Sequence, residues 1–226
     1  MNDSTGTRFT DAGSTDQRWI AAVLRLVLRT TLQRTFRAGL PVEQQRARLR
    51  RVTRLTLPPR GASFTEATVG GVPGEWVRAR RHERPSLTLL YLHGGGYTTG
   101  SPATHRALTG HLAARCDARV FAADYRLAPE HPFPAALDDA VAAWRGLRGE
   151  GLDAGRIAIA GDSAGGGLAV ATALRLRALG EPLPRALVLF SPWVDLTLGQ
   201  LSAVPPGEVM LTLPWIRECA GSYVAG

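Results

Sequence analysis

RIAIAGDSAGGGLA, residues 156–169, is the stretch of this 226-residue chain that decides its fold. Its first five residues form an apolar run typical of a buried strand, and a helical pattern follows directly. Between them, GDSAG at 161–165 fits G-x-S-x-G, which sets a serine on a sharp strand-to-helix turn. Gly161 and Gly165 are small enough to let the strand and the helix approach closely. The stretch predicts a nucleophile elbow that lifts the hydroxyl of Ser163 out of a sheet, at the N-terminus of a helix.

A second glycine-rich motif follows another apolar run. LTLLYL at 87–92 leads directly into His93-Gly94-Gly95-Gly96. Glycines at the end of a strand let backbone N–H groups point into a site with no side chain in the way, as an oxyanion hole requires. Because His93 directly precedes these donors, we expect it to stiffen the loop by hydrogen bonding rather than to act as a base.

The remaining pattern alternates short strands with helices. Residues 64–69 and 75–80 read as a hairpin that turns at 70–74. Apolar strands joined by helices indicate a mostly parallel, doubly wound α/β sheet. The predicted strands are 87–92, 119–124, 156–160 and 185–190, and the predicted helices are 103–115, 134–147, 164–179 and 214–223.

Four segments in this order carry a family resemblance: HGGGY from 93, DYRLAPEHPFPAALDD from 124, GDSAGGGLA from 161 and SPWVDL from 191. The chain resembles the hormone-sensitive-lipase-like carboxylesterases, a family of α/β-hydrolases, from about residue 60 onward. The resemblance implies the α/β-hydrolase fold with a helical cap. It also implies substrates that are small esters with short or medium acyl chains, and no metal or organic cofactor.

The resemblance assigns roles at the site as well. It implies that Ser163 is the nucleophile and that the N–H groups of Gly95, Gly96 and Ala164 form the oxyanion hole. Asp162, beside the nucleophile, is expected to organise the loop. The segment from 124 holds an arginine and a carboxylate, Arg126 and Glu130, for which a structural pair is the expected role.

Three segments are expected along the chain. Residues 1–58 form a basic amphipathic cap segment, 59–198 the hydrolase core and 199–226 a second cap segment. In this fold the acid and the histidine of the triad follow the serine, whereas all five histidines here precede Ser163. The expectation is therefore a member shortened at its C-terminus, with the last two strands missing and strand 185–190 left as a sheet edge open to self-association.

Two functions remain open at this point. One is a serine esterase whose turnover is very low for want of a base, with His131 or His93 as the first alternatives for that role. The other is a non-catalytic protein of the same fold, or an inactive fragment, that binds a small acyl or hydrophobic ligand in the pocket.

The distribution of charge along the chain argues against nucleic acid as a partner. The net charge of +8 lies in residues 1–60, with twelve arginines against four acids, so the remainder has a net charge of zero. Nucleic-acid binders spread arginine over the body of the fold, so we do not expect that function. A helix predicted from Asp16 has an apolar stripe from Trp19 to Leu32 and arginines opposite. The preferred expectation places residues 17–38 over the mouth above Ser163, with Arg18, Arg25 and Arg29 outward. The alternative is contact with a membrane surface.

Two further expectations concern the cellular compartment and the cysteines. The polar, acid-containing first residues are unlike a secretory signal, which favours the cytoplasm. The two cysteines, Cys116 and Cys219, have no metal-ligand spacing and are expected to be buried thiols.

Overall fold

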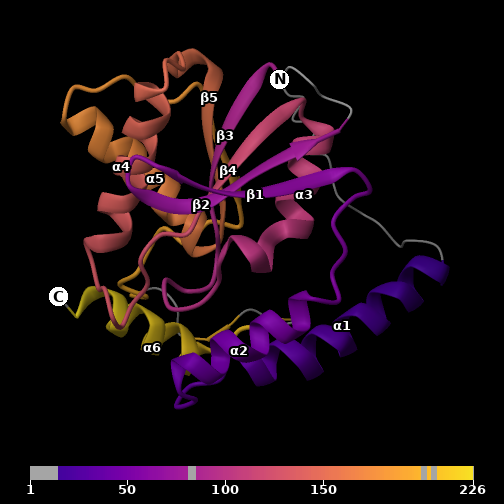
Figure 1. Ribbon diagram of the computed structural model, residues 1–226. Helices are drawn as coiled ribbons and strands as arrows, with labels where there is room; N and C mark the ends of the chain where they lie inside the picture. The colour runs from indigo at the N-terminus through magenta and orange to yellow at the C-terminus, as the bar shows by residue number, and fades with distance from the viewer. Residues whose placement is uncertain (1–14, 81–84, 200–202, 205–207, 226) are drawn as a thin grey trace, which may run out of the picture.

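The computed structural model describes residues 15–80, 85–199, 203–204 and 208–225. These residues contain a six-stranded sheet in the order β1-β2-β4-β3-β5-β6 (Figure 1). β1 pairs with β2 and β2 with β4 in antiparallel fashion, and the other three pairs are parallel. This is the mostly parallel sheet that the sequence predicts. The strands are β1 Ala62–Val69, β2 Val72–Ala79, β3 Leu87–Leu92, β4 Ala118–Ala123, β5 Ile157–Asp162 and β6 Leu187–Phe190.

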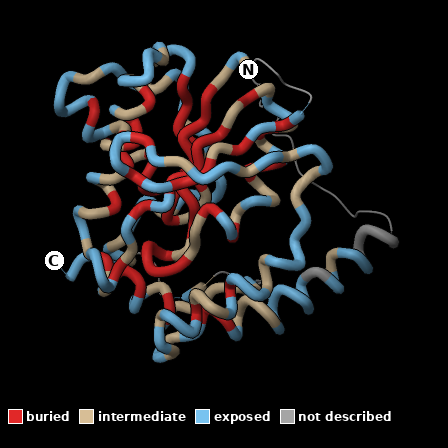
Figure 2. Tube along the Cα trace, in the orientation of Figure 1, coloured by how far each residue is buried: buried red, intermediate tan, exposed pale blue. Residues whose placement is uncertain are grey.

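Helices cover both faces of the sheet because successive side chains of the central strands point to opposite sides. Leu90 and Ile159 belong to a core shared with α4 (Ala135–Gly149) and α5 (Ala164–Ala178). Their neighbours Leu89 and Ala158 belong to a second core, shared with α3 (Arg106–Arg115). Figure 2 shows the buried residues concentrated in the middle of the sheet. The apolar runs of β3, β4 and β5 are buried on both faces, which explains why they lack polar alternation.

The predicted strands and helices are confirmed, with small differences at their ends. The hairpin turns at Gly70 and Gly71 rather than over 70–74, because both glycines have a positive φ and the return strand already begins at Val72. The helix expected over 103–115 begins with a 3₁₀ turn, η1, at Pro102–His105. Strand β6 lies at the edge of the sheet, as expected; self-association through that edge stays a prediction.

Three helices gather at one end of the sheet (Figure 1): α1 (Thr15–Thr35), α2 (Val42–Thr53) and α6 (Leu213–Val224). They share a small core in which Phe36, Leu49, Trp215 and Cys219 are buried. Cys116, in contrast, is exposed, so the expectation of two buried thiols is wrong for that residue. Its position directly after the last turn of α3 leaves it at the surface.

The expectation that residues 17–38 lie over the mouth above Ser163 is correct only for the C-terminal end of this segment. Leu32 and Phe36 do line the pocket that contains Ser163. The apolar stripe before them is exposed, including Trp19, Val23 and Val27. The side chain of Arg18 lies outside the described residues. Within the described residues, no helix is both long enough and apolar enough to cross a bilayer.

The close contact between the hairpin turn and α4 yields a test of the packing. A Cβ at Gly70 would lie 2.0 Å from the carbonyl oxygen of Ala142, whereas one at Gly71 would meet nothing within 4 Å. Both positions have a positive φ, which costs an alanine about 1–2 kcal/mol. We expect Gly70→Ala to lower the free energy of unfolding by about 1–3 kcal/mol more than Gly71→Ala, because α4 must shift. Urea unfolding of the two variants measures the difference, and equal losses would contradict the packing.

Candidate active site

Ser163 occupies the turn between β5 and α5 with φ 50° and ψ −118°, a strained conformation for a residue with a side chain. Its N–H donates to the carbonyl of Phe190 at 2.9 Å, and its carbonyl accepts from Trp193 at 2.8 Å. A Cβ at Gly165 would lie 2.0 Å from the carbonyl oxygen of Leu92, so this helix start touches the backbone of β3. The turn is therefore held by the strands on both sides of β5.

The glycine loop after β3 lies beside this turn. The carbonyl of Gly95 accepts hydrogen bonds from the N–H groups of Thr98 and Thr99, at 3.2 and 2.9 Å. Because a trans peptide points its N–H away from its carbonyl, the N–H of Gly96 is directed away from these threonines. In the part of the chain that the structure describes, the N–H groups of Gly95, Gly96 and Ala164 donate to no protein acceptor. Gly96 and Ala164 are buried and Gly95 is half-buried. Buried donors normally have a partner, so the site is suited to an oxygen that arrives with a ligand.

Asp162 joins the two motifs. Its Oδ1 accepts from the hydroxyl of Tyr91 at 2.5 Å and from the N–H of Gly94 at 2.9 Å. The Nε2 of His105 lies 3.6 Å from the same oxygen. Burial by itself would raise the pKa of Asp162, but its contacts with His105, Tyr91 and Gly94 together lower it below its ordinary value. The carboxylate is thus ionised at neutral pH and holds the loop against the end of β5.

His93 lies beneath the loop and is fully buried. Its Nδ1 is 2.9 Å from the carbonyl of Gly94, and its ring stacks on Tyr125 with centroids 4.3 Å apart. Burial, and next the neighbouring His105, lower the pKa of His93 to about 3. Among the described residues its Nε2 has no hydrogen-bond partner. A neutral, stacked ring below the loop is placed to support the loop.

His105 is the residue that the sequence analysis missed. It lines the same pocket as Ser163, whereas His93 and His131, the two named alternatives for a base, do not. Its Nδ1 lies 2.9 Å from the hydroxyl of Thr104 and 3.1 Å from the carbonyl of Ser101. The local signal was its place in η1, shortly after the glycine loop, but only the fold brings it to Asp162.

The pocket itself has a volume of about 190 Å³ and two kinds of wall. The polar wall comes from the motif residues of the core, and the apolar wall comes from α1, α2, α6 and the residues just before α6. The polar side comprises Gly94, Gly95, Gly96, Thr104, His105, Asp162 and Ser163, with Thr53 from α2, and the apolar side comprises Leu32, Phe36, Leu49, Met210, Leu211 and Trp215. Among the described residues, no cluster of three or more His, Cys, Asp or Glu side chains could hold a metal ion.

Trp215 connects the helices that form the apolar wall. Its Nε1 donates to Oε1 of the buried Gln45 on α2 at 2.7 Å, and its ring lies 4.7 Å from that of Phe36 at the end of α1. A Cβ at Gly96 would be 3.0 Å from this tryptophan. The apolar wall therefore packs directly on the glycine loop.

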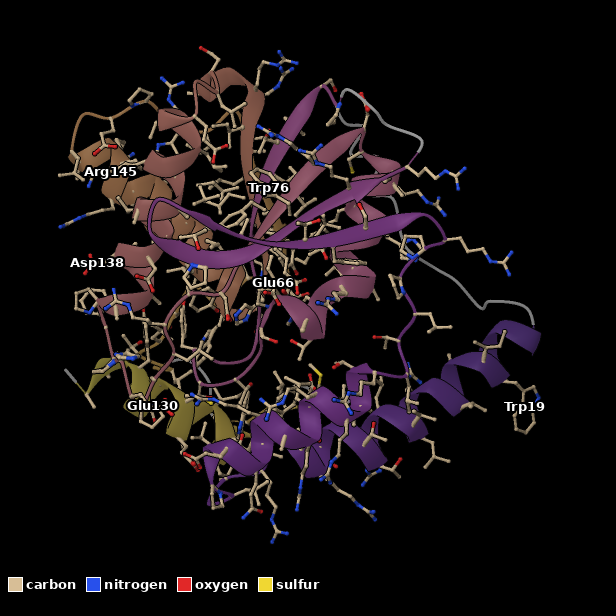
Figure 3. All side chains as sticks on the ribbon, viewed as in Figure 1. Trp19, Glu66, Trp76, Glu130, Asp138 and Arg145 are labelled. Atoms are coloured by element: carbon tan, nitrogen blue, oxygen red, sulfur yellow. The ribbon has the colours of Figure 1, made fainter. Side chains whose placement is uncertain are left out.

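Arg46 attaches α2 to the core by a second route. Its Nε donates to the carbonyl of Thr98 at 2.8 Å, and its two terminal nitrogens bind the carboxylate of Glu130 at 2.7 and 2.8 Å (Figure 3). The expected pairing of Arg126 with Glu130 is therefore wrong. Arg126 binds Asp139 at 2.7 Å instead, because α4 presents that carboxylate to both its backbone N–H and its guanidinium.

The lowered pKa of Asp162 predicts a pH dependence of stability. A carboxyl group whose pKa is lower in the folded state stabilises the fold above its unfolded pKa, and this stability is lost as the pH falls. We expect the free energy of unfolding of the wild type to decrease below about pH 5 and Asp162→Asn to lack part of this decrease. At pH 7 the variant should be less stable by about 1–3 kcal/mol. Urea unfolding between pH 7 and pH 3 tests this, and identical pH profiles would contradict the role of Asp162.

The chain is similar in sequence to a family of known proteins. A family model described as alpha/beta hydrolase fold matches residues 89–226. An acetyl-hydrolase of Streptomyces hygroscopicus is 48% identical over 161 residues, which cover 70% of this chain and 53% of that protein. A putative acetyl-hydrolase of Mycobacterium tuberculosis, LipR, is 38% identical over 203 residues, which cover 89% of this chain and 66% of that protein. The chain thus spans between half and two thirds of the length of these two curated relatives.

Solved structures extend the likeness to three dimensions. An esterase from the bacterial hormone-sensitive lipase family matches with a TM-score of 0.79 and 35% identity, covering 96% of this chain and 71% of that one. A hormone-sensitive lipase from a metagenome library matches with a TM-score of 0.83 and 39% identity, covering 91% and 69%. They confirm the α/β-hydrolase fold that the sequence predicts. Since the family model spans more than half of the chain and the structural match nearly all of it, the chain belongs to the hormone-sensitive-lipase-like esterase family of α/β-hydrolases.

Proposed function

We propose that this chain carries the nucleophile and the oxyanion hole of a serine hydrolase acting on small carboxylic esters with short or medium acyl chains. One observation carries the proposal: Ser163 shares a pocket with a glycine loop whose N–H groups at Gly95 and Gly96, like that of Ala164, have no acceptor in the described residues. The two relatives named acetyl-hydrolase support the same reaction class.

The proposed reaction uses the hydroxyl of Ser163 and the three backbone N–H groups beside it. The Oγ of Ser163 attacks the carbonyl carbon of the ester, and its proton passes to a general base. We assign this base to none of the described residues, because none accepts a hydrogen bond from the Ser163 hydroxyl. The carbonyl oxygen becomes an oxyanion, which accepts hydrogen bonds from Gly95, Gly96 and Ala164. Collapse of this intermediate breaks the bond to the alcohol oxygen, which takes the proton from the base, and the acyl-serine that remains is hydrolysed by water to the acid and free serine. Donors of this kind contribute about 2.7–4 kcal/mol each to lowering the barrier.

The neighbouring residues hold the glycine loop and the serine turn in place and do not act on the substrate themselves. Asp162 fixes the loop through the N–H of Gly94, and His93 packs beneath it. Gly161 and Gly165 allow the strand, the turn and the helix to come together. The nitrogens of His105 face Thr104, Ser101 and Asp162, so we assign it no part in the proton transfer. This chemistry draws on side chains and backbone groups and calls for no cofactor.

The walls of the pocket support a small apolar ester as the substrate. Leucine, methionine and aromatic side chains from the helical cap face the polar groups around Ser163 across about 190 Å³. Such a pocket favours an apolar chain on one side and a reacting carbonyl on the other.

A second candidate is a binding protein that holds a small acyl ligand without turning it over. One observation favours it: among the described residues no side chain is hydrogen-bonded to the hydroxyl of Ser163. The two candidates differ in whether Ser163 forms a covalent bond.

Covalent labelling tests the nucleophile without requiring turnover. A fluorophosphonate should label the wild-type chain, because attack on phosphorus uses the same hydroxyl and the same oxyanion hole. Ser163→Ala should abolish labelling, and Ser222→Ala, which removes a serine that lines a neighbouring cavity, should leave it unchanged.

Intact-protein mass spectrometry reads out the adduct, and p-nitrophenyl butyrate measures turnover in the same samples. Labelling that survives Ser163→Ala would overturn the assignment of the nucleophile. A folded wild-type chain that is never labelled would favour the binding protein.

A further inference from the structure

The first half of α1 presents an apolar face to solvent. Trp19 is 69% exposed, Ile20 60%, Val23 56% and Val27 48%. Figure 3 shows Trp19 on the outlying end of this helix, pointing away from the body. Single exposed apolar residues are common, but a row of them along one helix face indicates an interaction surface. These four residues are called the α1 stripe below.

The periodicity of the helix places the stripe on the side away from the protein. The helix docks through Leu32 and through Phe36, which directly follows its last residue; both line the pocket, four residues apart on one face. At 3.6 residues per turn, Arg25 and Arg29 fall on that same face, and the α1 stripe falls roughly opposite. Turning the helix to bury the stripe would pull Leu32 and Phe36 out of the pocket. The described body of this chain therefore cannot cover the stripe while the pocket keeps its wall.

The charge around the stripe indicates what could cover it. Residues 1–60 carry the whole net charge of +8. Eight arginines on α1, α2 and their flanks are exposed: Arg25, Arg29, Arg34, Arg37, Arg48, Arg50, Arg51 and Arg54. A second copy of the chain would bring the same positive charges together. An anionic lipid surface accepts both the apolar side chains and the arginines.

We propose that α1 binds the surface of an anionic membrane, with the α1 stripe at the boundary between headgroups and acyl chains. Exposed arginines outside the docked face, such as Arg34 on the side of the stripe, pair with lipid phosphates. Trp19 lies at the interface, where tryptophan is favoured. Because Leu32 and Phe36 of the same helix wall the pocket, binding brings the pocket close to the bilayer. The proposal goes beyond ester hydrolysis and does not depend on it.

Flotation of the full chain with vesicles tests the proposal. We compare vesicles of phosphatidylcholine alone with vesicles that also contain phosphatidylglycerol. The wild type should float with the mixed vesicles only, and less at high salt. Val23→Asp/Val27→Asp should reduce the bound fraction about tenfold or more, because two apolar contacts are replaced by charges that repel the lipid. Val194→Asp, at a residue 66% exposed outside α1, should float like the wild type.

A second variant keeps the stripe intact in case the aspartates unfold α1. Arg50→Glu/Arg54→Glu changes two exposed arginines of α2 and its flank, and should weaken flotation with anionic vesicles to a similar degree. Absence of flotation by the folded wild type would overturn the proposal. So would undiminished binding of the Val23→Asp/Val27→Asp chain, or a wild-type dimer that this variant dissociates in the absence of vesicles.

Discussion

The carboxylate of Asp162 is the contact on which the site depends, because it joins the ends of two neighbouring strands. It accepts from Tyr91 within β3 and from Gly94 just beyond it, while its own backbone leads into Ser163. The pairing of β3 with β5 already brings the glycine loop and the serine turn side by side at the C-terminal ends of these strands, and the carboxylate fixes one against the other. Partial burial of the carboxylate makes the link costly to break, since a lost partner would leave polar groups unpaired where water reaches them poorly.

Further contacts attach the helices α2 and α6 to this pair of motifs. Arg46 reaches from α2 to the carbonyl of Thr98, the residue whose N–H binds Gly95. Trp215 packs against Gly96 from the other side. The glycine loop is therefore held from below by the core and from above by α2 and α6. Its geometry depends on contacts between segments far apart in the sequence, since Arg46 and Thr98 are 52 positions apart and Gly96 and Trp215 are 119 positions apart.

The sequence predicted what is local and missed what depends on tertiary contact. Apolar runs and turn residues located the strands, and the motifs located Ser163 and the glycine loop, since each signal lies within a few consecutive residues. The role of His105 depends on where η1 folds back over β5, and no local pattern encodes that. The same holds for the pairing of Arg46 with Glu130, 84 residues apart. The amphipathic pattern of α1 was found, but a pattern does not say which face meets the body.

The docking of α1 shows why its amphipathic pattern alone does not tell which face meets the body. Two residues near its end, Leu32 and Phe36, determine its docking, although the longer apolar row lies earlier in the helix. They dominate because they meet an apolar cavity already formed by Leu49 and Trp215, whereas the earlier residues extend past the edge of the body. In the function proposed above, reaction and substrate shape would consequently depend on different parts of the chain. The core motifs hold Ser163 and the glycine loop, and α1, α2 and α6 set the apolar wall of the pocket, so this wall can change while the serine turn stays as it is.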